Sequence, residues 1–161
     1  APNIEKVGDR FLQWNMKIKN IYFPKLKVVG YSFLKENTSL TEVNLESLEQ
    51  VGNEFLVSNN CLEKLNLPRL KRVGTDFLFH NNVLTSLVLP ELDQAGSYFL
   101  YHNEILSELY APNLTVAGKC FLFRNNMLEN FDLSNLKTFG KNFCNSNINV
   151  KAKVLSRKKL K

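Results

Sequence analysis

Hydrophobic and polar positions along the chain follow a pattern that repeats every 22 residues. Each unit reads P-x-L-x-x-V-G-x-x-F-L-x-x-N-x-x-L-x-x-L-x-L, and residues 68–89 are its cleanest copy. All seven glycines share one register of this repeat, and all five prolines share another. A sustained period of this length is typical of stacked supersecondary units, in which each unit contacts only its neighbours.

Two segments of the unit predict different local structures. The closing L-x-x-L-x-L segment alternates with a period of two and is rich in aliphatic residues, which predicts a short half-buried strand. The proline that follows lacks an N–H group, so the strand ends there. The glycine six residues later indicates a turn that needs either positive φ or a close backbone approach. After it, Phe77 and Leu78 should point inward from a segment long enough for a turn or two of helix.

We therefore predict an α/β fold in which residues 1–155 form a right-handed solenoid of about seven repeats. A parallel β-sheet should line the concave face, with turns or short helices on the convex face, because parallel strands need right-handed return connections. Val150, Ala152 and Val154 alternate with lysines, which predicts a final strand. Residues 156–161 are predicted to be a basic tail. Because the chain begins inside a repeat, we expect it to be a fragment of a larger protein.

The repeat also carries a family resemblance. The L-x-x-L-x-L-P of residues 62–68 resembles the strand segment of leucine-rich repeats. Its continuation, L-x-x-V-G-x-x-F-L-x-x-N-x-x-L, is similar to the BspA-like class, also called the Treponema pallidum type, and the resemblance covers residues 2–155. The chain has Phe-Leu where that class commonly has Ala-Phe, and Asn where it often has Cys. The resemblance implies protein binding by a surface or secreted protein of bacteria or some protozoa, in a class that includes adhesins.

Charge separates the repeats from the end of the chain. The formal net charge is +6, and residues 151–161 hold six bases and no acid, which leaves 15 bases and 15 acids in residues 1–150. The repeat array is therefore neutral, and no nucleic-acid partner is expected for it. We interpret the tail as a solvated terminus, with contact to nucleic acid or an anionic membrane as the alternative. No apolar run is long enough for a transmembrane segment.

Motifs for catalysis or metal binding are missing from the sequence. It contains no nucleophile elbow, zinc-protease motif or phosphate loop, so we predict neither an enzyme nor a cofactor. Its three cysteines have no C-x-x-C spacing, which disfavours structural zinc. His80 and His102 should approach each other on adjacent turns, but two histidines without a convergent carboxylate or thiolate make a poor ligand set. We therefore predict no metal site.

The outward positions of the predicted strands are the positions that the repeat leaves free. They mix aromatic, amide and charged side chains, as a recognition surface does. A strand face that is merely soluble is the alternative. The predicted partner-binding residues are Tyr22, Glu42, Asn44, Lys64, Asn66, Ser86, Val88, Glu108, Tyr110 and Asp132.

A rival row of side chains directly follows the Phe-Leu pair. Phe79, Tyr101 and Phe123 recur at intervals of 22 and should stack on consecutive turns, with Val57 before them. Exposed to water they would form a second partner-binding patch, and buried they would belong to the core. The solvent exposure of Phe79 and Tyr101 distinguishes the two interpretations.

The most regular polar feature is one asparagine in every repeat. An amide supplies two donors and an acceptor, so a buried stack of amides can satisfy the backbone groups of successive tight turns. We predict a structural role, and we expect Asn81→Ala to lower the melting temperature without abolishing partner binding. The ladder consists of Asn15, Asn37, Asn59, Asn81, Asn103, Asn125 and Asn147.

Taken together, these features predict a non-catalytic protein–protein interaction module. The resemblance favours a bacterial surface or secreted recognition protein of the adhesin kind. The alternative is the substrate-recognition region of a larger secreted effector or enzyme whose catalytic domain lies elsewhere. Because terminal repeats normally need capping, we also expect either further sequence upstream or end-to-end association of chains.

Overall fold

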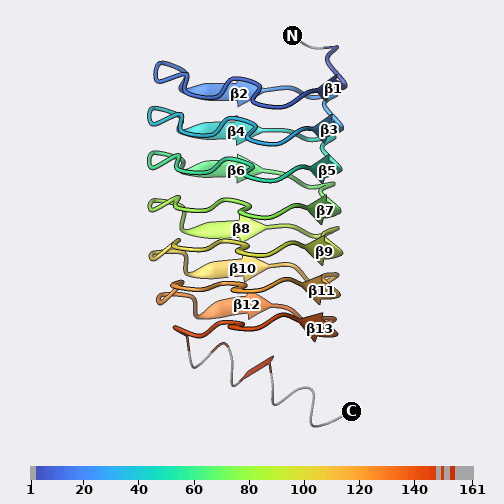
Figure 1. Cartoon of the computed structure of the whole chain (residues 1–161), viewed down its shortest axis with the longest axis vertical. Coiled ribbons are helices and arrows are strands. Elements are labelled where there is room, and N and C mark those ends of the chain that lie inside the picture. Colours follow the sequence, from blue (N-terminus) through green and yellow to red (C-terminus); the bar gives the residue numbers. More distant parts are fainter. Residues whose placement is uncertain (1–2, 148–149, 151–152, 155–161) are drawn as a thin grey trace.

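The computed structural model describes residues 3–147, 150, 153 and 154 of the chain. It is an almost straight stack of similar turns (Figure 1). Strands of two and three residues alternate along the chain. They are β1 (Lys6–Val7), β2 (Asn20–Tyr22), β3 (Val28–Val29), β4 (Glu42–Asn44), β5 (Gln50–Val51), β6 (Lys64–Asn66), β7 (Arg72–Val73), β8 (Ser86–Val88), β9 (Gln94–Ala95), β10 (Glu108–Tyr110), β11 (Val116–Ala117), β12 (Asn130–Asp132) and β13 (Thr138–Phe139).

The strands pair in parallel to form three sheets. The two-residue strands build one seven-stranded sheet in the order β1-β3-β5-β7-β9-β11-β13. The three-residue strands build two separate sheets, β2-β4-β6 and β8-β10-β12. Each residue pairs with the residue 22 positions along, as Lys6 does with Val28 and Glu42 with Lys64. The sequence repeat is therefore the turn of a parallel β-solenoid, as predicted.

The α/β class is wrong for the repeats, because the described residues 3–147 contain no helix. Three residues in a typical turn have positive φ, as Asp76 (56°), Leu78 (55°) and His80 (58°) do. Their N–H groups bond to neighbouring turns: Asp76 to Ser97 O (3.0 Å), Leu78 to Phe55 O (2.9 Å) and His80 to Tyr101 O (3.0 Å). A helix needs its N–H groups for its own chain four residues back, so these bonds exclude one. The connection consists of turns, the other form that we predicted.

The glycine in repeats two to seven serves close packing and not positive φ. None of the described glycines has positive φ, whereas all 20 described residues with positive φ are other types, and none of those is β-branched. A Cβ atom on Gly96 would lie 2.4 Å from Gly74 O. Only glycine lets the backbones of successive turns approach this closely. The expected close approach is therefore present, and the expected positive φ is wrong.

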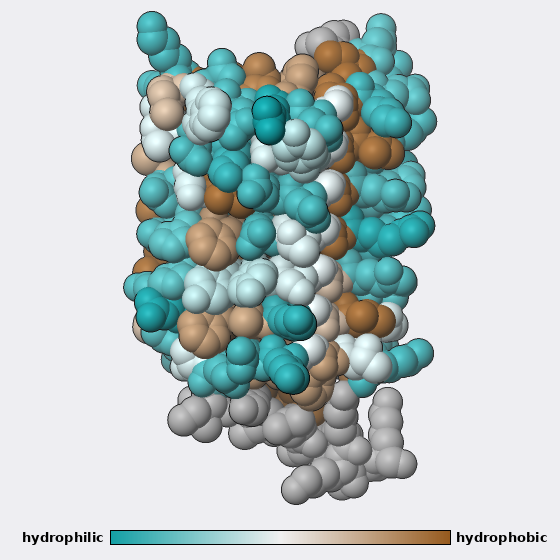
Figure 2. All heavy atoms as spheres, viewed as in Figure 1, coloured by the Kyte–Doolittle hydropathy of each residue, from teal (hydrophilic) through white to brown (hydrophobic). Residues whose placement is uncertain are grey.

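The core lies between the sheets and the turn segments. One phenylalanine per turn forms a continuous stack with ring centroids 4.9–6.0 Å apart and planes within 9° of parallel. The leucine after each of these rings is also buried in turns two to six. On the side of the molecule drawn in Figure 2, hydrophilic side chains dominate, and hydrophobic ones form a narrow band along the stack near the seven-stranded sheet. Across the described residues, no helix is both long and apolar enough to span a bilayer.

The repeated asparagines are bonded to backbone groups in successive turns. Asn81 Nδ2 donates to Leu56 O (2.9 Å), and Asn81 Oδ1 accepts from Asn59 N–H (3.2 Å). Asn103 keeps the donor bond, to Leu78 O (2.8 Å), but its Oδ1 is buried with no partner. The same holds at Asn125. The amide donors are thus used along the ladder, whereas the acceptor bonds between turns stop after Asn81.

Val150 and Val154, two of the three residues that defined the predicted final strand, are helical, so that prediction is wrong. The described residues Val150, Lys153 and Val154 have helical conformation. Val150 and Val154 are both buried, as the i, i+4 spacing of one helix face requires. Asn147 Oδ1 accepts from Val150 N–H (3.1 Å), which is the geometry of a helix N-cap. Within the part of the chain that the structure describes, six turns have a three-residue strand, and the seventh contributes β13 alone. Ala152 and the tail of residues 156–161 lie outside the described residues.

Candidate binding surfaces

The strand face carries the side chains that the sequence assigned to partner binding. In each three-residue strand the central side chain points into the core and its two neighbours point outward. The largest exposed apolar groups on this face are Tyr22 (58% exposed), Val88 (56%) and Tyr110 (46%). Asn44 and Asp132 are half-buried, and the other predicted residues, Glu42, Lys64, Asn66, Ser86 and Glu108, are exposed.

A break divides the strand face into two halves. Leu45 N–H bonds to Asn66 O (3.1 Å) and Leu89 N–H bonds to Tyr110 O (2.8 Å), but within the fully described residues 63–90 no such bond leads from Leu67. Strand β6 is accordingly not paired with β8. The solenoid still continues through this point, because the seven-stranded sheet is unbroken.

The two halves of the strand face present different chemistry. In the first half, Asn66 Nδ2 donates to Asn44 Oδ1 (2.9 Å), and Asn44 Nδ2 donates to Glu46 Oε1 (3.0 Å). These amides largely satisfy one another. In the second half, a shallow groove of about 320 Å³ crosses β8, β10 and β12, with Val88 and Tyr110 among its lining residues. An apolar groove with a few polar groups is the more typical form of a binding site.

The acidic side chains Glu108 and Asp132 also line the groove of the second half. Its other lining residues are Ser86, Leu87, Leu109, Asn130 and Phe131, so no basic residue is among them. Lys153 lies nearby, with its Nζ 5.7 Å from the centroid of the Phe131 ring. The groove therefore combines an apolar floor with negative charge.

The rival row of aromatic side chains lies on the opposite, turn-forming side of the repeat. Phe79 and Tyr101 stack with centroids 5.0 Å apart, and Tyr101 stacks on Phe123 at the same distance. All three are half-buried, whereas Val57 before them is buried. The near-complete burial that would have assigned Phe79 and Tyr101 to the core is not observed. The row stays a candidate surface.

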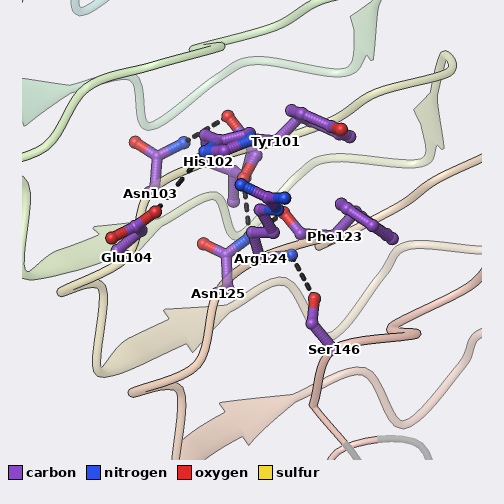
Figure 3. A network of polar contacts seen from close by, with 9 residues as sticks. Tyr101, His102, Asn103, Glu104, Phe123, Arg124, Asn125 and Ser146 are labelled. Carbon is purple, nitrogen blue, oxygen red and sulfur yellow. Dashed lines mark hydrogen bonds and ion pairs between the residues drawn. The ribbon is translucent and has the colours of Figure 1, made fainter.

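Two histidines flank this row and stack on each other. The rings of His80 and His102 are 4.5 Å apart, and His102 Nδ1 lies 3.5 Å from Glu104 Oε1 (Figure 3). Burial lowers the pKa of His102, and the neighbouring His80 and Arg124 lower it further. His102 is therefore neutral at pH 7, and its contact with Glu104 is not an ion pair there. Among the described residues, no group of three or more His, Cys, Asp or Glu side chains is arranged to hold a metal ion.

The backbone beside the histidines is fixed by a side chain of the next turn. Arg124 N–H donates to Ser146 Oγ, in place of the carbonyl that accepts from the corresponding N–H groups of earlier turns (Figure 3). His102 N–H, for example, donates to Phe123 O (3.0 Å). The lateral bonding of the turn segments thus continues to the end of the stack.

A second groove, on the turn face of the first four turns, was missed by the sequence analysis. It has a volume of about 540 Å³, and Arg10, Trp14, Tyr31, Glu54 and Asp76 are among its lining residues. These side chains occupy positions near the Phe-Leu pair that vary from repeat to repeat. This variation between repeats could have indicated the groove, because these positions, like those of the aromatic row, are ones that the repeat pattern does not specify.

Comparison with known families identifies the repeat. The family model of the BspA type leucine rich repeat region matches residues 1–82 and 58–158, with six copies. No curated protein and no solved structure matches the chain significantly. The match covers almost the whole chain and agrees with the 22-residue turns of the solenoid, so the chain belongs to the BspA-type leucine-rich repeat family.

Proposed function

We propose that this solenoid is a non-catalytic module that binds another protein through its strand face. The observation that carries the proposal is the groove over β8, β10 and β12, where Val88 and Tyr110 are exposed side by side on paired strands. Exposed aromatic and aliphatic side chains around a groove are typical of the centre of a protein interface. The family assignment supports the same class of function.

The charge of the groove indicates what kind of partner segment it takes. Two acids, Glu108 and Asp132, line the groove, and one base, Lys153, lies over the Phe131 ring, so the groove keeps a net negative charge. Complementary charge raises association rates and excludes wrong partners. The partner segment should therefore present an apolar side chain together with lysine or arginine.

The test is a quantitative pull-down from host and bacterial extracts with the intact chain and with a Val88→Ala, Tyr110→Ala double variant. We expect the double variant to lose the partner, because the few hot-spot residues near the centre of an interface each cost about 2 kcal/mol or more when they are truncated. Met127→Ala is the matched control, since Met127 is an exposed apolar side chain outside this groove and outside the aromatic row. Equal recovery of every partner by the double variant and the control would remove the strand-face groove from the proposal.

The finer assignment rests on the family resemblance. We propose a bacterial surface or secreted recognition protein of the adhesin kind. The alternative is the substrate-recognition region of a larger secreted effector or enzyme. Protease treatment of intact cells followed by detection of this chain tests the surface assignment, and the full-length reading frame tests the alternative.

End-to-end association of chains is a further part of the proposal. In the first turn Phe11 and Leu12 are only partly buried, whereas their counterparts Phe33 and Leu34 are fully buried. A second chain that stacks on this turn would cover the same apolar surface that the next repeat covers elsewhere. Sedimentation of the intact chain against a Phe11→Glu variant tests this, and an unchanged monomeric mass for both would refute it.

A further inference from the structure

The groove on the turn face of the first four turns combines an aromatic rim with a polar floor. Trp14 is the only tryptophan in the chain and is 62% exposed. Tyr31 is exposed as well, and the guanidinium of Arg10 lies 5.4 Å from the centroid of its ring. Both aromatic rings line the groove. Large planar side chains in water at a groove offer rigid contact area to a ligand with an apolar face.

The polar groups of the groove are held in place by neighbouring turns. Glu54 Oε2 accepts from Ser32 Oγ (2.6 Å) and from Lys35 Nζ (3.0 Å). These two bonds lower the pKa of Glu54, so it is ionised and oriented. Asn53 Oδ1 accepts from Thr75 N–H (2.9 Å), which fixes its amide. The groove thus presents acceptors and donors that have already lost much of their rotational freedom.

Charge excludes nucleic acids and other polyanions as ligands of this groove. Its lining contains two bases, Arg10 and Lys35, and two acids, Glu54 and Asp76. The charges therefore balance, and the two carboxylates would repel phosphate or sulfate groups. Burial and the proximity of Glu54 raise the pKa of Asp76, which shows that a further negative charge is disfavoured there.

Backbone pairing makes an extended peptide a poor ligand. Ser32 N–H donates to Asn53 O (2.8 Å), and Glu54 N–H donates to Thr75 O (2.8 Å). These main-chain groups are used between turns and offer no free ladder for an added strand. The ligand must instead be recognised by side chains, through an apolar face and several neutral hydrogen-bonding groups.

We propose that this groove binds a neutral oligosaccharide. A pyranose ring has an apolar C–H face that packs on Trp14, and hydroxyl groups that both donate and accept. Glu54 accepts from these hydroxyls, and the Asn53 amide and Arg10 donate to them. The groove crosses four successive turns, so it accommodates a short chain of sugars in preference to a single ring. This site is separate from the strand face and from the protein partner proposed for it.

Tryptophan fluorescence provides a direct assay, because Trp14 is the only tryptophan of the chain. The intact chain is titrated with cellohexaose, chitohexaose, maltohexaose and xylohexaose. We expect a saturable change in emission with at least one of these neutral glycans. Heparin and a lysine-rich peptide serve as charged comparisons. No saturable change with any of the four glycans, or a stronger response to heparin or the peptide, overturns the proposal.

Variants then locate the site. By calorimetry, Trp14→Ala should weaken binding of the responding glycan about tenfold, and Asn53→Ala should weaken it to a similar extent. Both side chains are exposed, and unchanged thermal melting verifies the fold. Tyr22→Ala removes an equally exposed aromatic side chain from the strand face and should leave glycan binding unchanged. Undiminished binding by Trp14→Ala overturns the proposal, whereas unchanged recovery of the protein partner by the Val88→Ala, Tyr110→Ala double variant overturns only the proposed strand-face function.

Discussion

The asparagine ladder makes a prediction that compares two adjacent turns. Asn81 and Asn103 occupy the same position of the repeat, and both are fully buried. Asn81 makes three bonds: to Leu56 O (2.9 Å), to Phe79 O (3.4 Å), and from Asn59 N–H (3.2 Å). Asn103 makes only the two donor bonds, and its Oδ1 is buried without a partner. Replacing each by alanine should therefore have unequal effects.

The difference can be worked out from the groups that each substitution leaves behind. Asn81→Ala leaves Leu56 O and Asn59 N–H buried without another bonding partner in the structure. At about 1–3 kcal/mol for each group, the loss is roughly 4 kcal/mol. Asn103→Ala leaves one carbonyl, Leu78 O, and removes an oxygen that was already unsatisfied, so the two effects nearly offset and the net loss is about 1 kcal/mol. The cavity left by the side chain is the same in both.

Thermal unfolding followed by circular dichroism measures this difference. For a chain of this length, 1 kcal/mol corresponds to about 2–4 °C, so the melting temperature of Asn81→Ala should lie roughly 6–12 °C below that of Asn103→Ala. Urea titration of the same pair gives the free energies independently. Equal destabilisation of the two variants would show that the Oδ1 bond between turns contributes nothing. A larger effect at Asn103 would refute the reasoning altogether.

Three further predictions concern packing and charge. Gly96→Ala places a Cβ 2.4 Å from Gly74 O and should destabilise the fold by about 3 kcal/mol in urea titration, whereas Gly8→Ala, with no atom within 4 Å, should change it little. The pKa of His102 is lowered in the fold, so its contribution to stability is present above about pH 6.5 and is lost as the pH falls further. His102→Gln should therefore reduce the fall in melting temperature between neutral and acidic pH. The pKa of Asp76 is raised in the fold, so its contribution to the stability of the fold is present at pH 3 and lost at neutral pH. Asp76→Asn should therefore raise the melting temperature at pH 7 but not at pH 3.

The sequence predicted the stack because the inward positions are periodic. Val43, Leu65 and Leu87 alternate with outward residues in every repeat, and this alternation determined both the strands and their register of 22. The conformation of the turn segment could not be predicted in the same way. Leu78 has a positive φ that its own preferences disfavour, and the bonds to the turns on either side stabilise that conformation. Local propensity carries no information about such neighbours.

The predicted strand near the end of the chain was wrong for a related reason. Val150 and Val154 fit a strand and a helix equally well, because a spacing of four satisfies both periods. The side chain of Asn147 decides between them, since its Oδ1 accepts from Val150 N–H and begins a helix. In earlier turns the same side-chain oxygen accepts from the previous asparagine, as Asn81 Oδ1 does from Asn59 N–H. Asn147 keeps the predicted donor role, because its Nδ2 donates to Asn125 O (2.9 Å) and Leu128 O (3.0 Å) of the preceding turn, and only its acceptor bond differs.

The candidate surfaces consist of residues at positions that the repeat pattern does not specify, and the structure divides these surfaces more finely than the sequence did. The outward strand columns run through all six turns, but the ladder between β6 and β8 is broken. Asn44 and Asn66 bond to each other before the break, Val88 and Tyr110 line the groove after it, and a pocket lined by both Asn66 and Val88 lies across it. The acceptor bonds of the asparagine ladder stop at Asn81, one turn from this break. Both interruptions lie in the middle of the stack while the seven-stranded sheet continues past them. The solenoid therefore consists of two blocks that are joined by the seven-stranded sheet, by the lateral hydrogen bonds of the turn segments and by the phenylalanine stack. A partner that crosses the centre of the strand face would contact both blocks.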